Sequence, residues 1–398
     1  MPFAFGAFVA LLPTYLIRFH IGLLPTTLLE IIFWAFFGCW LFIDGRRRKA
    51  WSALGRWAEP MLLLFIGGTV GVLISPDTLA ALGLWRAYIL EPMLLFVMCA
   101  DLFKKDRSVE MVRRGFAFLL IVIGLTAVYQ KITGFGIPNP VWQAVEHRRV
   151  TSFFGFPNAI GLLVAPLLPL MAGWAAALIR EKKRPAALPI LAFGLGIAAI
   201  AFAVSEGAMI GVAAGLMIFC VAYRPLRILA VCSIIAACLI VSLYRPATDY
   251  VSGILGMTDD STSVRAVVWR ESWAMLKDHP VFGAGLAGYP AIMSAYHSVQ
   301  HIEIFQYPHD IFLNFWSETG LIGLIGFLGI VILFFVRIVP VARRRPDDPW
   351  IAAVAAAMVA LLVHGLVDVP YFKNDLAMLF WLIVALADTQ QLYERRKG

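Results

Sequence analysis

Twelve apolar stretches, each about as long as a membrane-spanning helix, divide this sequence. Because 61% of the residues are hydrophobic and only 15% are charged, a water-soluble fold could not cover so much apolar surface. We therefore predict a single all-α membrane domain over residues 1–398, a polytopic bundle of about twelve transmembrane helices. The stretches lie at residues 3–17, 26–43, 60–76, 79–100, 115–131, 152–178, 186–204, 207–222, 228–244, 309–336, 350–368 and 374–390.

Positive charge is concentrated in six short blocks, which hold 23 of the 33 Lys and Arg residues. Lys and Arg collect on the cytoplasmic side of membrane proteins. If both termini are cytoplasmic, all six blocks fall on that side, and we predict this topology. The blocks comprise Arg46, Arg47, Arg48, Lys49 and Arg56; Lys104, Lys105, Arg107, Arg113 and Arg114; Arg180, Lys182, Lys183 and Arg184; Arg224 and Arg227; Arg337, Arg343, Arg344 and Arg345; and Arg395, Arg396 and Lys397.

The same topology places two long segments, residues 132–151 and 245–308, on the outer face. Loops of this length in a compact bundle are usually functional. In the second loop, apolar residues recur at helical spacing with charged residues between them. We predict an amphipathic helix there, on the outer membrane surface or across the mouth of the bundle. This helix either serves the function or only packs the loop down. Its apolar residues are Val264, Val268, Trp269, Trp273 and Leu276.

Several patterns that can mark cofactor or metal sites carry little weight here. Residues 283–288 fit GxGxxG, but no strand precedes them, and we interpret their glycines as allowing a tight loop to press against the bundle. Of the acidic pairs at 259–260 and 347–348, the first resembles a helix cap and the second is cytoplasmic. The five cysteines lie inside or at the ends of apolar segments, so we expect no disulfide and no metal site. In a membrane protein, the distribution of charge is more informative about partners and topology than the net charge of +8. We expect no cofactor and no nucleic-acid partner.

Ionisable residues gather at or just beyond the outer membrane boundary. Charges inside membrane spans are costly and usually face a cavity or a partner, so their presence at one depth predicts a shared polar site. Each residue alone also fits a structural role, because Arg86 with Glu91 or His364 with Asp368 could form internal pairs. The set comprises Arg18, His20, Arg86, Glu91, Arg149, Glu206, Arg265, His309, Asp310, His364 and Asp368.

The order of motifs between about 150 and 370 resembles the O-antigen ligase and O-antigen polymerase superfamily. Its members have an Arg and a Trp that open a large outer loop, a Pro-x-x-Gly-x-Gly turn, and a His with Asn or Asp at the start of the next helix. One element departs: many members carry Ser-Arg-Gly where this chain has Ser205-Glu206-Gly207. The matching segments are Arg149-Val150-Thr151-Ser152 to Pro157-Asn158, Ser263-Val264-Arg265 with Trp269, His279-Pro280-Val281-Phe282-Gly283-Ala284-Gly285, His309-Asp310-Ile311-Phe312-Leu313-Asn314, Glu318-Thr319-Gly320-Leu321-Ile322-Gly323 and His364-Gly365-Leu366-Val367-Asp368-Val369-Pro370.

The resemblance implies transfer of a glycan from a polyprenyl (undecaprenyl) diphosphate carrier to an acceptor hydroxyl at the outer face of a bacterial cytoplasmic membrane. Such a reaction needs cations for the departing diphosphate and a base for the acceptor proton, and would be inverting and metal-independent. The arginine fork matches phosphate oxygens, and a neutral histidine can accept a proton. The donor's tail also requires a lateral opening between helices. The residues expected to act are Arg265, Arg149 and Arg86 on the diphosphate, His309 as general base, and Asp310, Glu318, Asp368, His364 and Glu206 as orienting or acceptor-side groups.

Three other functions stay open at this point. A repeat-unit polymerase shares the motifs of a ligase, so the acceptor could be a glycan, a lipid or a protein. A transporter or lipid-glycan flippase often has twelve helices, but such proteins usually place charges near the bilayer midplane. A structural membrane scaffold is a third alternative. The position of the charges at the outer boundary favours an enzyme.

Overall fold

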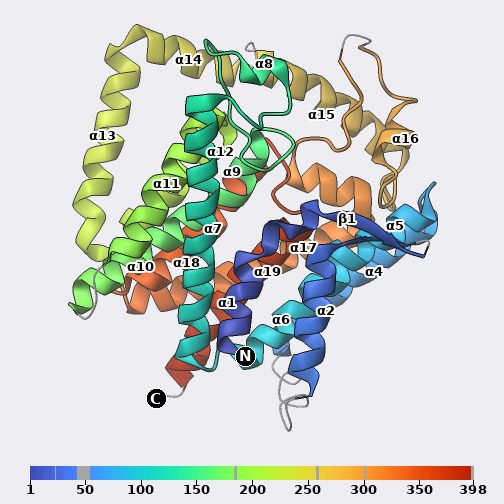
Figure 1. Cartoon of the computed structure of the whole chain (residues 1–398). Helices are drawn as coiled ribbons and strands as arrows, with labels where there is room; N and C mark the ends of the chain where they lie inside the picture. Colours follow the sequence, from blue (N-terminus) through green and yellow to red (C-terminus); the bar gives the residue numbers. More distant parts are fainter. Residues whose placement is uncertain (23, 43–53, 183–185, 257–259, 300–301, 396–398) are drawn as a thin grey trace.

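The computed structural model describes residues 1–22, 24–42, 54–182, 186–256, 260–299 and 302–395. Over these ranges the chain forms a bundle of helices, and each of the twelve predicted apolar stretches lies mainly on helical backbone (Figure 1). The basic residues at 46–49, 183–184 and 396–397 and the acidic residue Asp259 lie outside the described ranges.

The elements follow one another with short connections, except around residues 42–54, 134–157 and 279–310. In the first part of the chain they are α1 (Pro2–Ala10), η1 (Leu12–Leu16), β1 (Arg18–Ile21), β2 (Leu24–Thr27), α2 (Leu28–Leu41), η2 (Gly55–Trp57), α4 (Ala58–Ile74), α5 (Thr78–Trp85), η3 (Arg86–Leu90), α6 (Glu91–Leu102), α7 (Asp106–Thr133) and α8 (Pro140–Gln143). The remaining elements are α9 (Asn158–Val164), α10 (Leu167–Glu181), α11 (Ala187–Ala203), α12 (Glu206–Ala222), η4 (Arg224–Leu226), α13 (Arg227–Leu243), α14 (Arg245–Leu255), α15 (Asp260–Asp278), α16 (Tyr289–Met293), α17 (Ile311–Arg344), α18 (Pro349–Gly365) and α19 (Asn374–Arg395).

Six helical segments of the described chain are long and apolar enough to cross a membrane. Four further apolar helices of 10–17 residues, α2, α11, α12 and α18, are shorter. These segments confirm the predicted helical membrane bundle, while the number of twelve spans stays a prediction. The six long segments are Gly55–Ile74, Thr78–Leu102, Asp106–Thr133, Asn158–Glu181, Arg224–Leu243 and Ile311–Arg344.

A β-hairpin that the hydropathy pattern does not predict connects the first two apolar stretches. Strands β1 and β2 pair in antiparallel register, with Arg18 opposite Thr27. Strand β2 leads directly into α2, where the Thr27 hydroxyl accepts a hydrogen bond from the Glu30 amide at 3.3 Å and the Glu30 carboxylate accepts one from the Thr27 amide at 2.8 Å. This capping box satisfies two amides that the helix itself leaves unpaired, which explains why α2 begins here.

Close packing of α12 on α18 positions much of the candidate site. Gly207, Gly211 and Gly215 lie four residues apart on the face of α12 that contacts α18. A Cβ atom on Gly211 would lie 2.8 Å from the Ala360 carbonyl oxygen, so only glycine allows this separation. Small residues promote such close approach between membrane helices. The contact brings the first turn of α12 beside the last turn of α18.

Helix α17 is interrupted at Gly320, where φ is 67° and ψ is −177°. The chain after α15 returns to the bundle at this break, because the Leu321 amide donates to the Val281 carbonyl at 2.8 Å and the Ala284 amide donates to the Ser317 carbonyl at 2.7 Å. A Cβ atom on Gly283 would lie 2.4 Å from the Ser317 carbonyl oxygen. The glycines of 283–288 therefore let a tight turn press against the bundle, as the sequence predicts.

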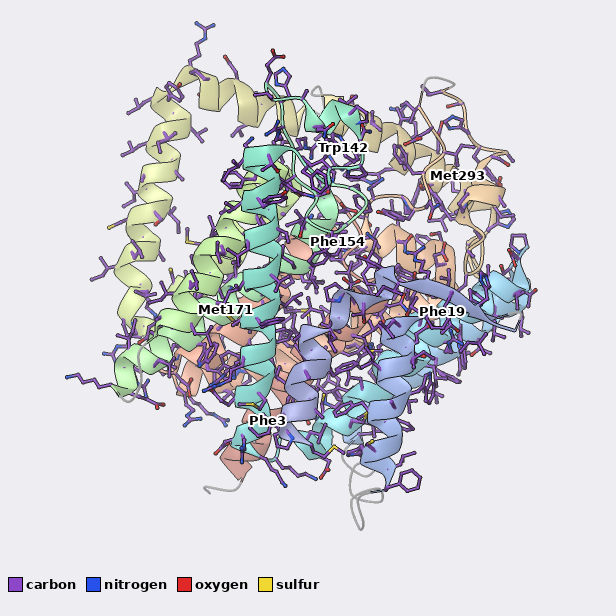
Figure 2. The ribbon with its side chains drawn as sticks, viewed as in Figure 1. Phe3, Phe19, Trp142, Phe154, Met171 and Met293 are labelled. Atoms are coloured by element: carbon purple, nitrogen blue, oxygen red, sulfur yellow. The ribbon has the colours of Figure 1, made fainter. Side chains whose placement is uncertain are left out.

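The two ends of the bundle differ in what they carry. Both chain termini lie at the lower end of the view, whereas α8, α14 and α15 lie at the upper end (Figure 1). Phe3 lies near the lower end and Trp142 near the upper end (Figure 2). This arrangement agrees with both termini on one side of a membrane and the two long loops on the other.

The large loop 245–308 is largely helical in its described residues. The helix expected around residues 264–276 is α15, on which Val268 and Leu276 are buried and Trp273 is 47% exposed. Helix α14, which precedes it, was not anticipated from the sequence, because its 11 residues mix apolar ones with five charged or hydroxylated ones: Arg245, Thr248, Asp249, Tyr250 and Ser252.

Candidate functional site

A cavity of about 220 Å³ lies where α12, α15 and α18 meet the segments that precede α9 and α12. Five of the nine predicted site residues line it, although they come from regions of the chain more than 200 residues apart. The lining residues are Arg149, Asn158, Val204, Ser205, Glu206, Gly207, Ser261, Arg265, His364 and Asp368.

Arg149 reaches the cavity from the loop that follows α8, and its backbone amide donates to the Trp142 carbonyl at 2.9 Å. Its guanidinium donates from Nε to the Ala203 carbonyl at 3.0 Å, and from Nη2 to the Val204 carbonyl at 3.0 Å and to Asn158 Oδ1 at 3.2 Å. Val204 adopts a left-handed backbone conformation with φ of 52°, which is uncommon for a β-branched residue and ends α11. Burial lowers the pKa of Arg149, and the negative charge of Glu206 opposes this effect.

Arg265 enters the cavity from α15. Its Nε donates to the Val367 carbonyl at 2.9 Å, and its Nη1 donates to the Ser261 hydroxyl one helical turn earlier. Among the side chains that the structure describes, neither Arg149 nor Arg265 forms an ion pair within 4.0 Å. Both guanidinium groups are held by uncharged acceptors, so the cavity carries two positive charges that no direct carboxylate contact neutralises.

His309 lies beside the cavity, with its Nδ1 3.4 Å from Oδ1 of Asp368. Its backbone is left-handed, with φ of 52°, and its ring contacts those of Phe305 and Tyr307, with centroids 4.9 and 4.8 Å away. Backbone strain at a non-glycine residue persists only where the surroundings enforce it, and it is frequent at functional sites. The imidazole is therefore held on three sides.

Asp368 connects His309 with His364. The Asp368 amide donates to the His364 carbonyl at 3.1 Å, and the Asp368 carboxylate lies beside the His309 ring. The Val369 amide donates to Oδ1 at 2.8 Å. His364 is buried and lines the cavity, and its Nδ1 has no hydrogen-bond partner among the described residues. The Asp368 carboxylate thus lies beside the His309 imidazole and lines the same cavity as His364.

Arg86 lies elsewhere, which differs from the expectation that it shares a diphosphate site with the other two arginines. Its Nη2 donates to Oε2 of Glu30 at 2.7 Å, and its Nε lies 3.6 Å from Oε1 of Glu91. Asn374 also donates to Glu30, at 3.2 Å. This network connects α2, η3 and α19, and two carboxylates already neutralise the Arg86 charge, so its contacts fit a structural role.

Asp310 and Glu318 each have a structural contact. Asp310 caps α17 by accepting a hydrogen bond from the Leu313 amide at 2.8 Å. Glu318 accepts from the Ala287 amide at 2.8 Å and holds the turn after α15 against α17. Neither residue lines the cavity of about 220 Å³.

The sequence interpretation did not count three polar residues of the cavity among the site residues: Asn158, Ser205 and Ser261. Asn158 and Ser261 hold the two arginines directly. Asn158 follows Pro157 at the start of α9, where a polar residue is ordinarily interpreted as a cap, and its place at the end of the matching segment that begins at Arg149 was the signal in the sequence.

Comparison with known proteins supports the resemblance described above. Residues 191–328 match the family model described as O-antigen ligase. The matched region begins within α11 and ends within α17, and contains Glu206, Arg265 and His309. Arg149, His364 and Asp368 lie outside it. No curated protein matches the chain.

Proposed function

We propose that this chain, which carries an O-antigen ligase domain over residues 191–328, transfers a glycan from a polyprenyl diphosphate carrier to an acceptor hydroxyl at the outer face of the membrane. The observation that carries the proposal is the cavity in which Arg149 and Arg265 converge beside the His309–Asp368 pair. Positive charge and a positioned base are the two things that this reaction requires.

The two arginines are suited to hold the donor diphosphate. Each guanidinium uses some of its five N–H groups on backbone or side-chain oxygens, which fixes its orientation and leaves other N–H groups for a ligand. A diphosphate between two fixed arginines would have its negative charge stabilised as the bond to the sugar breaks. Because their positions are fixed beforehand, little reorganisation is needed during the reaction.

His309 is suited to take the acceptor proton. Asp368 lies at Nδ1 and favours the tautomer that carries its proton there, which leaves Nε2 able to accept a proton from the attacking hydroxyl. An acceptor that attacks from the side opposite the diphosphate would invert the anomeric centre. His364 and Glu206 line the same cavity, and we assign them to the acceptor side.

Ligase and polymerase are two forms of this proposal, and they differ only in the acceptor. A transporter or flippase is a function of a different class. Five of the nine predicted site residues lie together at the end of the bundle that carries α8 and α15, which favours catalysis at one face over passage through the bundle.

The test is a transfer assay with purified protein, a synthetic polyprenyl diphosphate glycan and candidate acceptors, followed by mass spectrometry of the product. Arg265→Ala and His309→Ala are expected to lower the rate by about 10²-fold or more, because each removes a group that acts in the transition state. Arg270→Ala on the same helix and His20→Ala in β1 lie away from the cavity and are expected to retain activity.

Product formed at the wild-type rate by Arg265→Ala or His309→Ala would disprove the assigned roles. Movement of the intact lipid-linked glycan between leaflets, with no new glycosidic bond, would instead support the flippase. Acceptor choice separates the remaining forms: a glycan repeat unit as acceptor indicates a polymerase, and a different acceptor indicates a ligase.

A further inference from the structure

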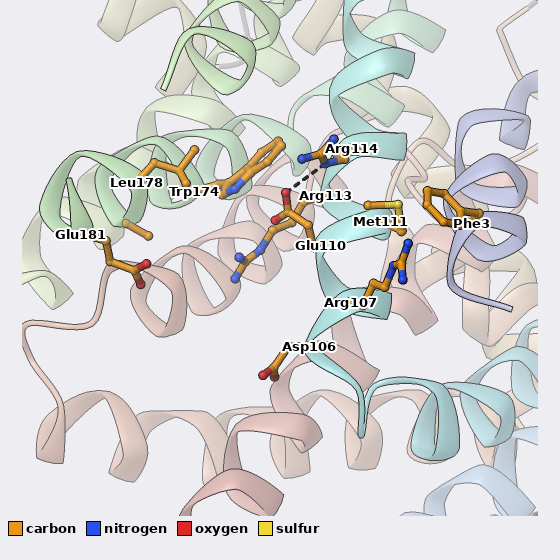
Figure 3. Close-up of a pocket in the computed structure, with 11 residues that line it drawn as sticks. Phe3, Asp106, Arg107, Glu110, Met111, Arg113, Arg114, Trp174, Leu178 and Glu181 are labelled. Carbon is orange, nitrogen blue, oxygen red and sulfur yellow. Dashed lines mark hydrogen bonds and ion pairs between the residues drawn. The ribbon is translucent and has the colours of Figure 1, made fainter. Parts of the chain in front are cut away.

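A second, larger cavity of about 650 Å³ lies among α1, the first turns of α7 and the last turns of α10 (Figure 3). None of its lining residues lines the candidate site. Phe3, which lines it, lies at the end of the bundle that holds the chain termini (Figure 2). Its volume falls within the range of about 300–1,000 Å³ that is usual for small-molecule sites.

The depth of this cavity corresponds to the headgroup layer of a membrane. Helix α7 has 28 residues and is about 42 Å long, whereas the hydrocarbon core of a bilayer is about 30 Å thick. The charged residues near its start all precede Gly115, and the next charged residue of the helix is Lys131. The first two turns of α7 therefore extend beyond the hydrocarbon core. Trp174 on α10 fits the same depth, because tryptophan is enriched at membrane interfaces.

Two buried N–H groups at this cavity have no hydrogen-bond partner among the described residues. They are Nε1 of Trp174, whose side chain is only 2% exposed, and Nε of Arg113. The Arg113 guanidinium stacks 3.7 Å from the centre of the Trp350 ring, which fixes its position. Buried donors in proteins are nearly always paired, so two of them at one cavity indicate an acceptor that the protein itself does not supply.

The charges around the cavity are balanced. Three arginines and three carboxylates line it (Figure 3). One of each, Arg114 and Glu110, forms an ion pair at 3.0 Å. An anionic ligand would meet the carboxylates and a cationic one the arginines, whereas a ligand that carries both charges complements both sets. Met111 and Leu178 add apolar wall beside them.

We propose that this cavity binds the headgroup of a phospholipid that carries both a phosphate and a primary ammonium, as phosphatidylethanolamine does. The phosphate accepts hydrogen bonds from Arg113 and Trp174, and the ammonium donates to the carboxylates at the start of α7, of which Asp106 is the first. The acyl chains continue along the apolar surface of the bundle. This site lies away from the candidate active site and does not depend on the proposed glycan transfer.

Native mass spectrometry of the full-length, delipidated protein tests the proposal. The protein is mixed in turn with phosphatidylethanolamine, phosphatidylcholine and phosphatidylglycerol. We expect one molecule of phosphatidylethanolamine to be retained at least about tenfold more strongly than the other two, because a trimethylammonium group has no N–H to donate and a glycerol headgroup has no positive charge. Inorganic phosphate at millimolar concentration is expected not to displace it.

Two variants locate the site. Trp174→Phe removes one N–H group but keeps a ring, and Arg113→Gln removes the cation; each is expected to weaken retention by about tenfold, the effect of losing a hydrogen bond to a charged group. Arg343→Gln removes a positive charge at the end of α17, outside this cavity, and is expected to change nothing. Thermal unfolding without lipid shows whether each variant is folded. If Arg113→Gln does not fold, lipid retention by Trp174→Phe alone tests the site.

Three outcomes would overturn the proposal. Equal retention of the three lipids would indicate a nonspecific lipid shell. Preference for phosphatidylglycerol, or displacement by inorganic phosphate, would indicate a simple anion site. Unchanged retention in folded Trp174→Phe would show that the lipid binds elsewhere.

Discussion

At the scale of single residues, the three arginines assigned to one task from the sequence have different surroundings. Arg149 and Arg265 contact carbonyl, amide and hydroxyl oxygens, and both line the cavity of about 220 Å³. Arg86 contacts Glu30 and Glu91. Carboxylates beside an arginine offset its positive charge, so it attracts an anionic ligand only weakly. An arginine held by uncharged oxygens attracts such a ligand more strongly. The partners of each side chain, not its type, separate a structural from a ligand-binding role.

Glu271 provides a test at the same scale, in the large outer loop. Its Oε1 accepts hydrogen bonds from the amide and the hydroxyl of Ser298, both at 2.7 Å, and its Oε2 lies 3.2 Å from Nδ1 of His297. Burial raises the pKa of Glu271, but the Ser298 and His297 contacts outweigh it, and the net pKa lies below 4.5. A carboxyl group whose pKa is lower in the folded than in the unfolded chain stabilises the fold above its unfolded pKa, and this stabilisation is lost as the pH falls through the folded value.

We therefore expect Glu271→Gln to weaken the closure of this loop by about 1 kcal/mol at pH 7, because the Gln amide oxygen can still accept from Ser298 but lacks the charge that strengthens these hydrogen bonds. Hydrogen exchange at the Ser298 amide, read by mass spectrometry, should be faster in the variant, and the difference should shrink below about pH 4. Glu303→Gln, an exposed change in the same loop, serves as the control. Equal protection of the Ser298 amide in wild type and Glu271→Gln at pH 7 would contradict the expectation.

At the scale of secondary-structure elements, hydropathy predicts where the helices lie but not how they pair. The twelve stretches lie mainly on helices because an apolar run in lipid must satisfy its backbone hydrogen bonds internally. The break of α17 at Gly320 depends on contacts with a distant segment, and the β1–β2 hairpin forms at a short polar interruption. A hydropathy window does not detect the first and averages out the second. Helix pairing depends on close approach at particular residues, such as Gly207, Gly211 and Gly215.

Substitution at Gly211 tests this pairing. A Cβ atom there would lie 2.8 Å from the Ala360 carbonyl oxygen and 3.0 Å from the His364 Cβ, so we expect Gly211→Val to force α12 and α18 apart. Overpacking of this kind costs about 1–3 kcal/mol and should lower the thermal unfolding midpoint in detergent. It should also reduce transfer activity, because His364 lines the candidate site.

Gly194→Val on α11 is the matched control, because no atom lies within 4 Å of a Cβ atom built there. The control should unfold close to the wild-type temperature. An unfolding midpoint for Gly211→Val as high as that of Gly194→Val would show that the α12–α18 contact tolerates a larger side chain.

At the scale of the whole molecule, the two cavities lie towards opposite ends of the bundle. The candidate active site adjoins the end with α8 and α15, and the proposed lipid site adjoins the end with the termini. The distribution of Lys and Arg predicts that the second end is cytoplasmic. The candidate active site would then face the periplasm or exterior.

Cysteine labelling tests this orientation. In a background with the five native cysteines replaced, Glu146→Cys in the loop after α8 should react with a membrane-impermeant maleimide in intact cells. Arg343→Cys near the end of α17 should react only after the membrane is permeabilised. The reverse pattern would place the candidate active site on the cytoplasmic side and exclude the proposed topology.

The sequence by itself determined that the chain is a helical membrane bundle and that its motifs resemble the O-antigen ligase superfamily, because hydropathy, charge blocks and motif order are properties of short segments. Only the tertiary structure decided that Arg149, Arg265, His364 and Asp368 share one cavity and that Arg86 does not. All of these residues are ionisable and lie near the same predicted membrane boundary. Residue type and position along the sequence therefore do not show which of them share a site. Helix packing determines which of them meet, because glycine contacts and carbonyl groups at helix ends orient each side chain.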